Sequence, residues 1–163
     1  MNQAQAKDTR QQVAQAIRAV ESKKGEDVAI LEMDRASGAF TDYFVVCSGT
    51  NPRQIQAIAD EVERKLSQSG LRPNSMEGYT QAEWVLLDYV DFVVHIFSER
   101  ARKFYDLERL WKTATRVELA DLEKPEPRKV AVKRTVPTKT AAAAHSQKKA
   151  KGAARTSKRA RKS

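Results

Sequence analysis

Residues 84–97 hold two runs of alternating side chains, separated by only enough residues for a tight turn. Successive side chains of a strand point to opposite faces of a sheet. The alternation therefore predicts a β-hairpin, and with Tyr89 and Val90 in the turn Asp88 pairs with Asp91, Leu86 with Val93, and Trp84 with His95. One face of this hairpin is wholly apolar and consists of Val85, Leu87, Phe92, Val94 and Ile96.

The other face of the hairpin mixes aromatic, acidic and imidazole groups. It consists of Trp84, Leu86, Asp88, Asp91, Val93, His95 and Phe97. A tryptophan on a strand is more often a core residue covered by a helix. Buried carboxylates, however, need partners, and tryptophan is a favoured anchor of protein interfaces. We therefore expect this face to be partly exposed and to dock a protein.

The region before the hairpin predicts two helices and two strands. The first helix is expected to begin near Asp8 or Thr9, either of which is able to cap free amides, and to close at Gly25. Residues 27–33 and 43–48 have the apolar centres of strands, and a polar connector joins them.

A second helix is expected after residue 50, with Asn51 as the N-cap and Pro52 in the first turn. Its apolar stripe is Ile55, Ile58, Val62 and Leu66, at helical spacing. Gly70 is expected to end it. Residues 71–78 then predict a short edge strand, although Pro73 and Gly78 disfavour a strand there.

A last helix is expected from Ser98. Its predicted inward stripe is Phe104, Leu107 and Trp111, while Tyr105 and Glu108 face outward and extend the candidate docking surface. The order of elements predicts an α/β fold, a mixed sheet of about five strands with helices packed on it.

Charge divides the chain into two parts. Residues 124–163 hold 14 Lys and Arg against one acidic residue, a net charge of +13, and the whole chain carries +9, so residues 1–123 carry −4. We expect a folded domain at 1–123 and a disordered basic tail at 124–163, since the tail lacks large apolar groups. Such a charge attracts nucleic acid without sequence preference.

The single cysteine and the hydropathy of the chain indicate the cellular compartment of the protein. Cys47 is the only cysteine, so no internal disulfide forms and the chain suits a reducing compartment. The first residues lack the apolar core of a signal peptide, and no run reaches the roughly 18 apolar residues of a membrane span. A soluble cytoplasmic protein is expected.

Catalytic patterns are weak. The pair Gly49-Thr50, followed by Glu61 and Glu63, matches the residue types of a nucleotidyltransferase metal-binding motif. The two carboxylates, however, fall in the second helix, where they diverge by roughly 200° around the axis. Cys47 and His95 lack the further ligands that a metal site requires. No catalytic residue, cofactor or metal is expected.

Several motifs resemble the ribosomal silencing factor family, also called Iojap-type proteins. They are Thr41-Asp42-Tyr43-Phe44, Ser48-Gly49-Thr50, Ala59-Asp60, Glu77-Gly78, Trp84 with Asp88, Asp91 to His95, and Tyr105 to Trp111. The resemblance covers roughly residues 8–118 and leaves the basic tail outside. One departure lies at Tyr89-Val90, where family members often have a glycine-containing turn.

The resemblance implies a nucleotidyltransferase-like topology without known catalysis. It also implies a protein that binds the large ribosomal subunit at its fourteenth protein, blocks joining of the small subunit, and damps translation when nutrients are scarce. The expected partner-binding residues are Trp84, Leu86, Asp88, Asp91, His95, Tyr105 and Glu108. Nonspecific contact of the tail with rRNA and a homodimer off the ribosome are further expectations.

Two other functions are compatible with the residues. A nucleotide-dependent transferase would bind ATP and magnesium, and the missing metal carboxylates disfavour it. A nucleic-acid-binding module driven by the basic tail would lose all function when the tail is deleted.

Overall fold

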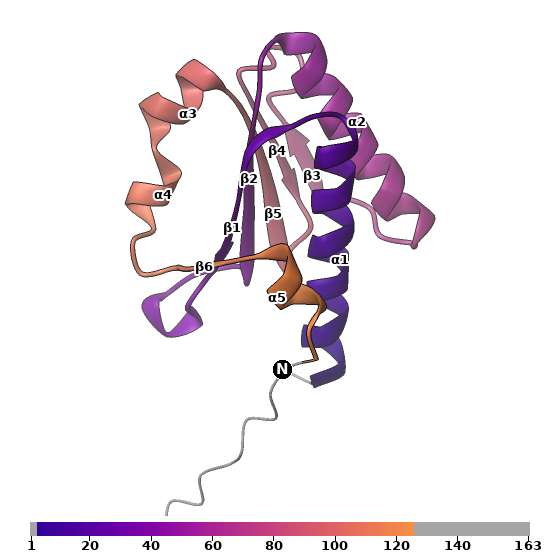
Figure 1. Cartoon of the computed structure of the whole chain (residues 1–163), viewed down its shortest axis with the longest axis vertical. Coiled ribbons are helices and arrows are strands. Elements are labelled where there is room, and N and C mark those ends of the chain that lie inside the picture. The colour runs from indigo at the N-terminus through magenta and orange to yellow at the C-terminus, as the bar shows by residue number, and fades with distance from the viewer. Residues whose placement is uncertain (1–2, 126–163) are drawn as a thin grey trace, which may run out of the picture. The chain divides into compact units, whose positions relative to one another are not determined.

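The computed structural model of the chain describes residues 3–125, which form an α/β fold around one mixed sheet (Figure 1). The strands lie in the order β3, β4, β5, β2, β1, β6 across the sheet. Their bounds are β1 Glu26–Glu32, β2 Tyr43–Gly49, β3 Ser75–Glu77, β4 Trp84–Asp88, β5 Phe92–Ser98 and β6 Thr115–Val117. Within this sheet β2 and β5 are parallel, and the other neighbours are antiparallel. The α/β prediction is confirmed, β3 is the expected edge strand, and β6 is an additional strand that the sequence pattern did not indicate.

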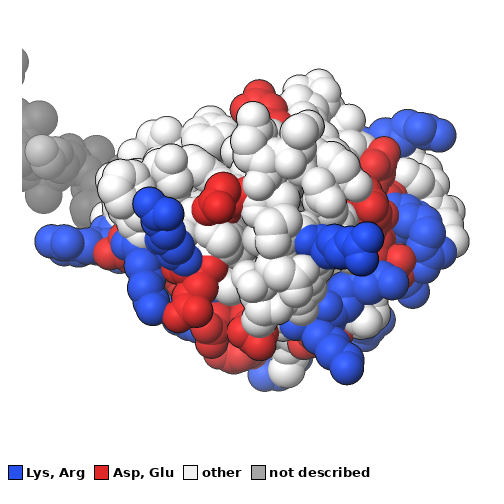
Figure 2. All heavy atoms as spheres, turned by 90° about the horizontal axis from the view of Figure 1, so that it is seen from above, with Lys and Arg blue, Asp and Glu red and all other residues white. Residues whose placement is uncertain are grey.

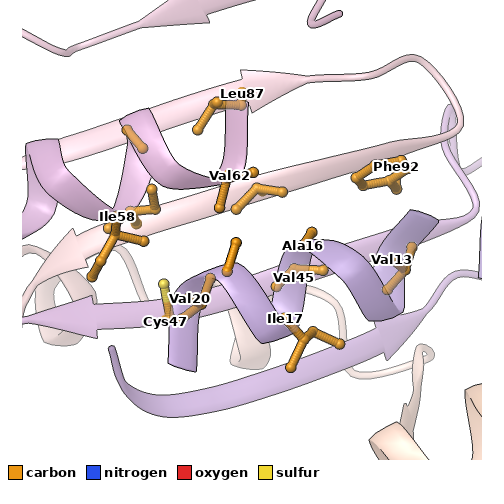
Figure 3. Close-up of a cluster of buried hydrophobic side chains, with 14 of the residues drawn as sticks. Val13, Ala16, Ile17, Val20, Val45, Cys47, Ile58, Val62, Leu87 and Phe92 are labelled. Atoms are coloured by element: carbon orange, nitrogen blue, oxygen red, sulfur yellow. The ribbon is translucent and has the colours of Figure 1, made fainter. Parts of the chain in front are cut away.

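Helices α1 (Gln3–Ser22) and α2 (Pro52–Gln68) lie side by side over one face of the sheet (Figure 1). The predicted apolar stripe of α2 is fully buried: Ile55, Ile58, Val62 and Leu66 are each 0% exposed. Figure 3 shows α1 and α2 directing their apolar side chains onto Val45, Leu87 and Phe92 of the strands. Burial of these stripes against the sheet is what holds the two long helices in place. A short helix, α5 (Leu119–Glu123), packs against α1.

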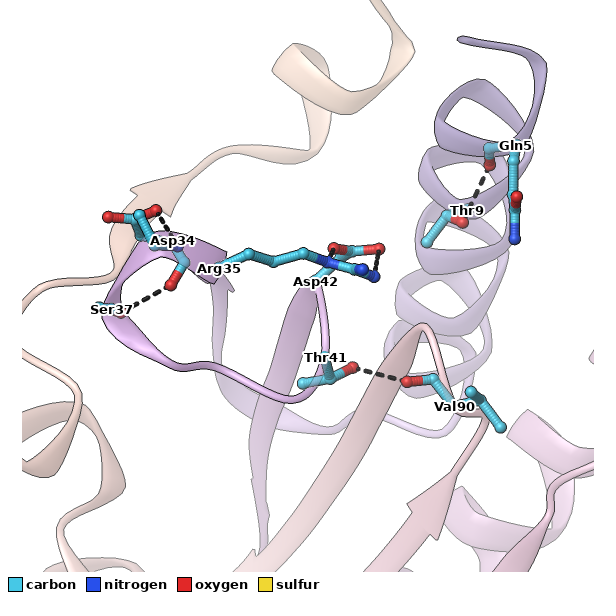
Figure 4. Close-up of polar contacts among 9 residues, drawn as sticks. Gln5, Thr9, Asp34, Arg35, Ser37, Thr41, Asp42 and Val90 are labelled. Carbon is cyan, nitrogen blue, oxygen red and sulfur yellow. Dashed lines mark hydrogen bonds and ion pairs between the residues drawn. The ribbon is translucent and has the colours of Figure 1, made fainter. Parts of the chain in front are cut away.

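The ends of these helices test the capping predictions. In α2 the Asn51 side chain accepts a hydrogen bond from the backbone N–H of Gln54 at 2.9 Å, so the predicted N-cap is confirmed. The predicted start of the first helix at Asp8 or Thr9 is wrong, because α1 already begins at Gln3. Thr9 instead donates its hydroxyl to the carbonyl of Gln5 at 3.0 Å, within the helix (Figure 4). The preceding residues are good helix formers and carry the helix back beyond the capping candidates.

The β4–β5 hairpin forms as predicted, but its register differs by two residues. Trp84 pairs with Phe97, Leu86 with His95, and Asp88 with Val93. The turn is Val90 and Asp91, closed by a hydrogen bond from the N–H of Tyr89 to the carbonyl of Phe92 at 2.9 Å. A shift of two residues leaves the side chains of β4 and β5 on their predicted faces, because side chains alternate with a period of two. Asp91, predicted to pair with Asp88, lies in the turn instead.

The predicted last helix is broken into α3 (Glu99–Tyr105) and α4 (Leu107–Leu110). Asp106 between them adopts a left-handed conformation, with φ of 43°. Phe104, in α3 before the break, was predicted to point inward but is 79% exposed, whereas Leu107, after the break, is buried as predicted at 8%. The backbone turn therefore replaces one long amphipathic stripe with two short ones.

The chain divides into two units, Met1–Pro127 and Arg128–Ser163. Residues 126–163 lie outside the described residues, and so do the predictions made for the basic tail. The boundary at residue 123 and the nucleotidyltransferase-like topology stay predictions. Across residues 3–125, every helix is too short or too polar to cross a membrane.

Candidate docking surface

The sheet face opposite α1 and α2 is lined with rings and is only partly covered, by α3 and α4. We call it the aromatic face, and it consists of Phe44, Trp84, His95, Phe97, Tyr105 and Trp111. Below the rings, Val46 and Val93 are buried at 0% and 3% exposure. The face thus has a packed base under a partly exposed aromatic layer.

Trp84 lies half-buried at the centre of this layer. Its indole stacks on Phe97 with ring centroids 5.1 Å apart and an interplanar angle of 26°. Tyr105, at the end of α3, lies over Trp84 with centroids 4.6 Å apart and is 48% exposed. Phe97 is 1% exposed, so the exposed rings rest on a buried one. Rigid aromatic groups of this kind are preferred anchors in protein interfaces.

His95 lies beneath Trp84 and not at the surface. The indole Nε1 of Trp84 donates a hydrogen bond to Nδ1 of His95 at 3.1 Å, and the rings of Phe44 and His95 pack in a T-shaped arrangement. His95 is 4% exposed, and its buried Nε2 has no hydrogen-bond partner among the described residues. Burial lowers the pKa of His95 to about 4, so the ring is neutral. In the structure His95 contacts the Trp84 anchor, and its own contact with a partner stays a prediction.

The remaining predicted hairpin residues line the strip from Trp84 down to the turn. Leu86, Asp88 and Asp91 are each half-buried. The carboxylate of Asp88 accepts a hydrogen bond from the N–H of Val90 at 2.8 Å, so this acidic group stabilises the turn as well as facing solvent. Whether these three residues contact a partner remains a prediction.

Arg102 fixes the segment that carries Tyr105. Its guanidinium forms an ion pair with Glu108 at 2.7 Å and donates a hydrogen bond to the hydroxyl of Ser48 at 3.0 Å and another to the carbonyl of Asp27. The Arg102 side chain is only 14% exposed and that of Glu108 only 29%. Glu108 was expected to face outward, but it is half-buried because its carboxylate forms the ion pair with Arg102.

The groups considered for catalysis are kept apart by the sheet. Cys47 belongs to the core under α1 and α2, whereas His95 lies on the opposite face, so the two do not form a nucleophile–base pair. Burial raises the pKa of the Cys47 thiol to about 12. Glu61 and Glu63 both lie in α2, and Glu61 pairs with Arg64 at 2.6 Å, which lowers its pKa. Within residues 3–125 no cluster of three acidic, histidine or cysteine side chains is arranged to hold a metal.

A cleft of about 570 Å3 opens where β2 and β5 end and α2 and α3 begin. Figure 2 views the molecule from this end and shows a largely uncharged centre bordered by acidic and basic side chains. The polar groups lining the cleft are occupied locally: Asn51 caps α2, and Ser98 caps α3 and donates to Glu83 at 2.9 Å. The polar side chains of the cleft therefore serve to cap the N-termini of α2 and α3.

Three residues of interest carried little sequence signal. Phe40 and Val90 are exposed apolar side chains in loops, and a lone phenylalanine in a polar connector was the only hint of the first. Arg102 looks like one of many charged residues on a helix. Its buried contacts depend on strands that are distant in sequence.

The comparisons with known proteins agree with one another. The family model described as "Ribosomal silencing factor during starvation" matches residues 6–157. A ribosomal silencing factor of Halalkalibacterium halodurans is 43% identical over 104 residues, covering 64% of this chain and 88% of that protein. A crystal structure of a Chromobacterium violaceum protein is 34% identical with a TM-score of 0.60, covering 63% of this chain and 84% of that one.

A eukaryotic relative extends the comparison. The Mus musculus protein named "Mitochondrial assembly of ribosomal large subunit protein 1" is 31% identical over 75 residues, covering 44% of this chain and 33% of that protein. The family match spans most of the chain, and its start near residue 6 agrees with the resemblance drawn from the motifs. Its end at residue 157 does not: the match takes in most of the basic tail, which the resemblance had left outside. The chain belongs to the ribosomal silencing factor family.

Proposed function

We propose that this protein binds the large ribosomal subunit at its fourteenth protein and prevents joining of the small subunit by steric exclusion, damping translation under nutrient limitation. The observation that carries the proposal is the partly exposed Tyr105–Trp84 pair, which packs on a buried Phe97 in a member of this family. The name of the mouse relative supports the large subunit as the partner. The proposed site of action is the cytoplasm.

The chemistry of the aromatic face fits a basic protein surface. Tyr105 and Trp84 supply apolar anchors, while Asp88 and Asp91 lie along the same strip toward the turn. The domain as a whole carries a net charge of −4 over residues 1–123. Charge complementarity with a basic protein accelerates encounter and sets orientation more than it raises affinity.

The proposed mechanism requires no chemical step. A domain of this size covers any partner surface on which its aromatic face rests, and a subunit that needs that surface is then excluded. We therefore propose a binding protein and not an enzyme. The same face is available to a second copy of the chain when no ribosome is present, which gives a reversible homodimer.

The decisive experiment is sedimentation of the full chain with separated ribosomal subunits. We expect it to pellet with large subunits and not with small ones, and to reduce formation of joined ribosomes. Equal pelleting with both subunits, by the full chain and also by a chain ending at Glu123, would overturn the proposal.

The anchor is tested with Tyr105→Ala, because this side chain is 48% exposed and its loss leaves the sheet intact. Loss of a central aromatic anchor commonly costs about 2 kcal/mol of binding free energy, roughly a thirtyfold weaker complex. The control is Glu21→Lys, an exposed position on α1, which covers the other face of the sheet. Normal affinity of a folded Tyr105→Ala variant would place the docking surface elsewhere.

The basic tail is proposed to add affinity through rRNA phosphates without setting the choice of subunit. Residues 124–163 carry a net charge of +13, so binding should weaken steeply with salt. A chain ending at Glu123 should keep its preference for large subunits and show a flatter salt dependence. An unchanged salt dependence would exclude a contribution of the tail to rRNA binding.

A further inference from the structure

We infer that two loops form a second docking point, which binds a basic protein surface of the large subunit. These loops lie at the end of the sheet opposite the cleft between α2 and α3. The loops are residues 33–42, between β1 and β2, and residues 88–91, at the β4–β5 turn; together we call them the loop tip. The inference rests on the proposed function, because it adds a second contact to the one made by the aromatic face.

The loop tip is held together by hydrogen bonds between the loops. The hydroxyl of Thr41 donates to the carbonyl of Val90 at 3.0 Å (Figure 4). The N–H of Asp42 donates to the carbonyl of Asp91 at 2.9 Å. Arg35 donates two hydrogen bonds to the carboxylate of Asp42, at 2.5 and 2.9 Å. Thr41 is 0% exposed. These contacts make the loop tip a preorganised surface, which reduces the entropic cost of binding.

Two apolar side chains project from this rigid tip. Phe40 is 70% exposed and Val90 is 63% exposed. They lie next to the hydrogen bond that joins the loops, since Phe40 precedes Thr41 and Val90 supplies the accepting carbonyl. Large apolar groups held out into solvent by a fixed backbone are typical of a surface that a partner covers.

The backbone of Val90 strengthens this inference. Its φ of 71° lies in the left-handed region, which a β-branched residue rarely adopts. Glycine or asparagine would meet the demands of this turn with less strain. Strained residues persist where the surrounding structure holds them and often mark functional positions. A valine here gives the tip an exposed apolar group that the turn itself does not need.

The charge of the loop tip selects the kind of partner. Its two loops contain four carboxylates, on Asp34, Asp42, Asp88 and Asp91, against the single guanidinium of Arg35, a net charge of −3. Arg35 is already paired with Asp42. This surface repels nucleic-acid phosphates and attracts Lys and Arg side chains. The occupant is therefore a basic protein surface with an apolar socket.

The loop tip is continuous with the aromatic face. The ring centroid of Phe40 lies 5.9 Å from that of Phe44, which lies 5.7 Å from that of Trp111. Trp84 and Asp88 mark the two ends of β4, which are about 13 Å apart at the usual rise of a strand. Two contacts at this separation would fix the orientation of the protein on its partner, where the aromatic anchor alone would leave rotation free.

The first test measures binding of full-length variants to purified large subunits. Phe40→Ser and Val90→Asn should each weaken binding about tenfold, as expected for loss of a peripheral apolar contact. Val90→Asn should melt at the same or a higher temperature, because asparagine tolerates the left-handed conformation. Phe40→Leu keeps an apolar group and should bind nearly as wild type does. Wild-type affinity of folded Phe40→Ser and Val90→Asn variants would overturn the inference.

These outcomes separate the inference from the proposed function. If the wild-type chain fails to select large subunits, the proposed function fails first. If the wild type binds and Tyr105→Ala weakens binding while the loop-tip variants do not, only the second docking point is excluded. Tighter binding of Phe40→Ser would also overturn the inference, since it would mean that the tip holds the basic segment of its own chain.

A photocrosslink identifies the occupant directly. The probe is the full chain with Phe40→p-benzoylphenylalanine, irradiated on purified large subunits. The expected product is a crosslink to a ribosomal protein through a basic segment. A crosslink to rRNA, or only to a second copy of the chain, would overturn the assignment. The same photoreactive residue at Glu21, on the opposite face, is the control and should give no such product.

Discussion

The indole of Trp84 donates its single hydrogen bond to Nδ1 of His95, 3.1 Å away, and so ties a half-exposed ring to a buried one. The proton of His95 is consequently on Nε2, and that group has no hydrogen-bond partner among the described residues. His95 is able to accept from Trp84 only while it is neutral, since a protonated imidazole has no acceptor. The orientation of the candidate anchor therefore depends on a histidine that does not reach the surface.

Trp84→Phe should destabilise the fold even though a ring of similar character remains. The phenylalanine still stacks on Phe97, but Nδ1 of His95 is left buried without a donor, which costs about 1–3 kcal/mol. Chemical denaturation of both proteins checks the value. A double-mutant cycle combines Trp84→Phe with His95→Leu. The stability losses of the two single variants should sum to more than the stability loss of the double variant. Strict additivity would show that the hydrogen bond contributes nothing.

Stability should fall as the solution is acidified from pH 6.5 toward pH 4. The pKa of His95 is lowered from 6.5 to about 4 in the folded state by burial, so the unfolded chain takes up a proton that the folded chain refuses. The contribution of His95 is complete above pH 6.5 and is reduced by about 2 kcal/mol at pH 5. Denaturation midpoints measured between pH 7.5 and pH 5 test this, because most carboxylates titrate at lower pH.

His95→Gln is the control for the acid effect. Glutamine accepts a hydrogen bond from Trp84 and does not titrate, so the variant should lose most of the pH dependence between 7.5 and 5. A slope equal to that of the wild type would assign the acid sensitivity to other groups.

Arg102→Ala should loosen the segment that carries Tyr105. It removes a largely buried ion pair with Glu108 and the hydrogen bonds to Ser48 and to the Asp27 carbonyl, and it leaves Glu108 without its partner. We expect a loss of about 2–4 kcal/mol in stability. Amide hydrogen exchange should become faster in α3 and α4 before it does so in β5, because the contacts of Arg102 join these helices to the sheet.

Lys103→Ala is the matched control for Arg102→Ala. The pair of Lys103 with Glu99 lies on the same helix, but its side chains are 76% and 80% exposed. Solvent and salt screen such a pair, so no measurable change in melting temperature is expected. Equal effects of the two substitutions would show that the buried position of Arg102 is not what matters.

Gly78→Ala should be severely destabilising. Gly78 has φ of 75°, and a Cβ atom there would lie 2.0 Å from the carbonyl oxygen of Trp84, a backbone atom with no freedom to move aside. Gly38 also has a left-handed backbone, with φ of 87°, but nothing lies within 4 Å of its Cβ position. Gly38→Ala should therefore cost only about 1 kcal/mol, and the difference in melting temperature between the two variants isolates the steric clash.

Local patterns in the sequence predicted much of the fold correctly. The stripe of Ile55, Ile58, Val62 and Leu66 identified a helix, and the alternation through 84–97 assigned the side chains of both hairpin strands to their faces. These predictions succeed because the periods of helices and strands are fixed by backbone geometry. The family was also predicted from short motifs, and its match to residues 6–157 confirms it.

Other features depend on single backbone dihedral angles that no periodic pattern encodes. The left-handed Asp106 divided a predicted helix, so Leu107 and Trp111 no longer continue a stripe that begins at Phe104. The hairpin turn moved to Val90 and Asp91, where Val90 takes a left-handed conformation that glycine adopts more easily. A single residue in an unusual conformation redirects everything after it, so an error of one angle changes which side chains reach the surface.

The class of fold, the two faces of the hairpin and membership of the family were predictable from the amino-acid sequence, because these follow from regular spacing and from contiguous motifs. Three relationships were visible only in the folded chain: His95 is buried under Trp84, Arg102 fastens α3 to β2, and Phe40 and Val90 come together at one end of the sheet. Each of those relationships joins residues from different elements. Their proximity is set by the order of strands in the sheet and by packing against it, and neither is written in the local sequence around any one of them.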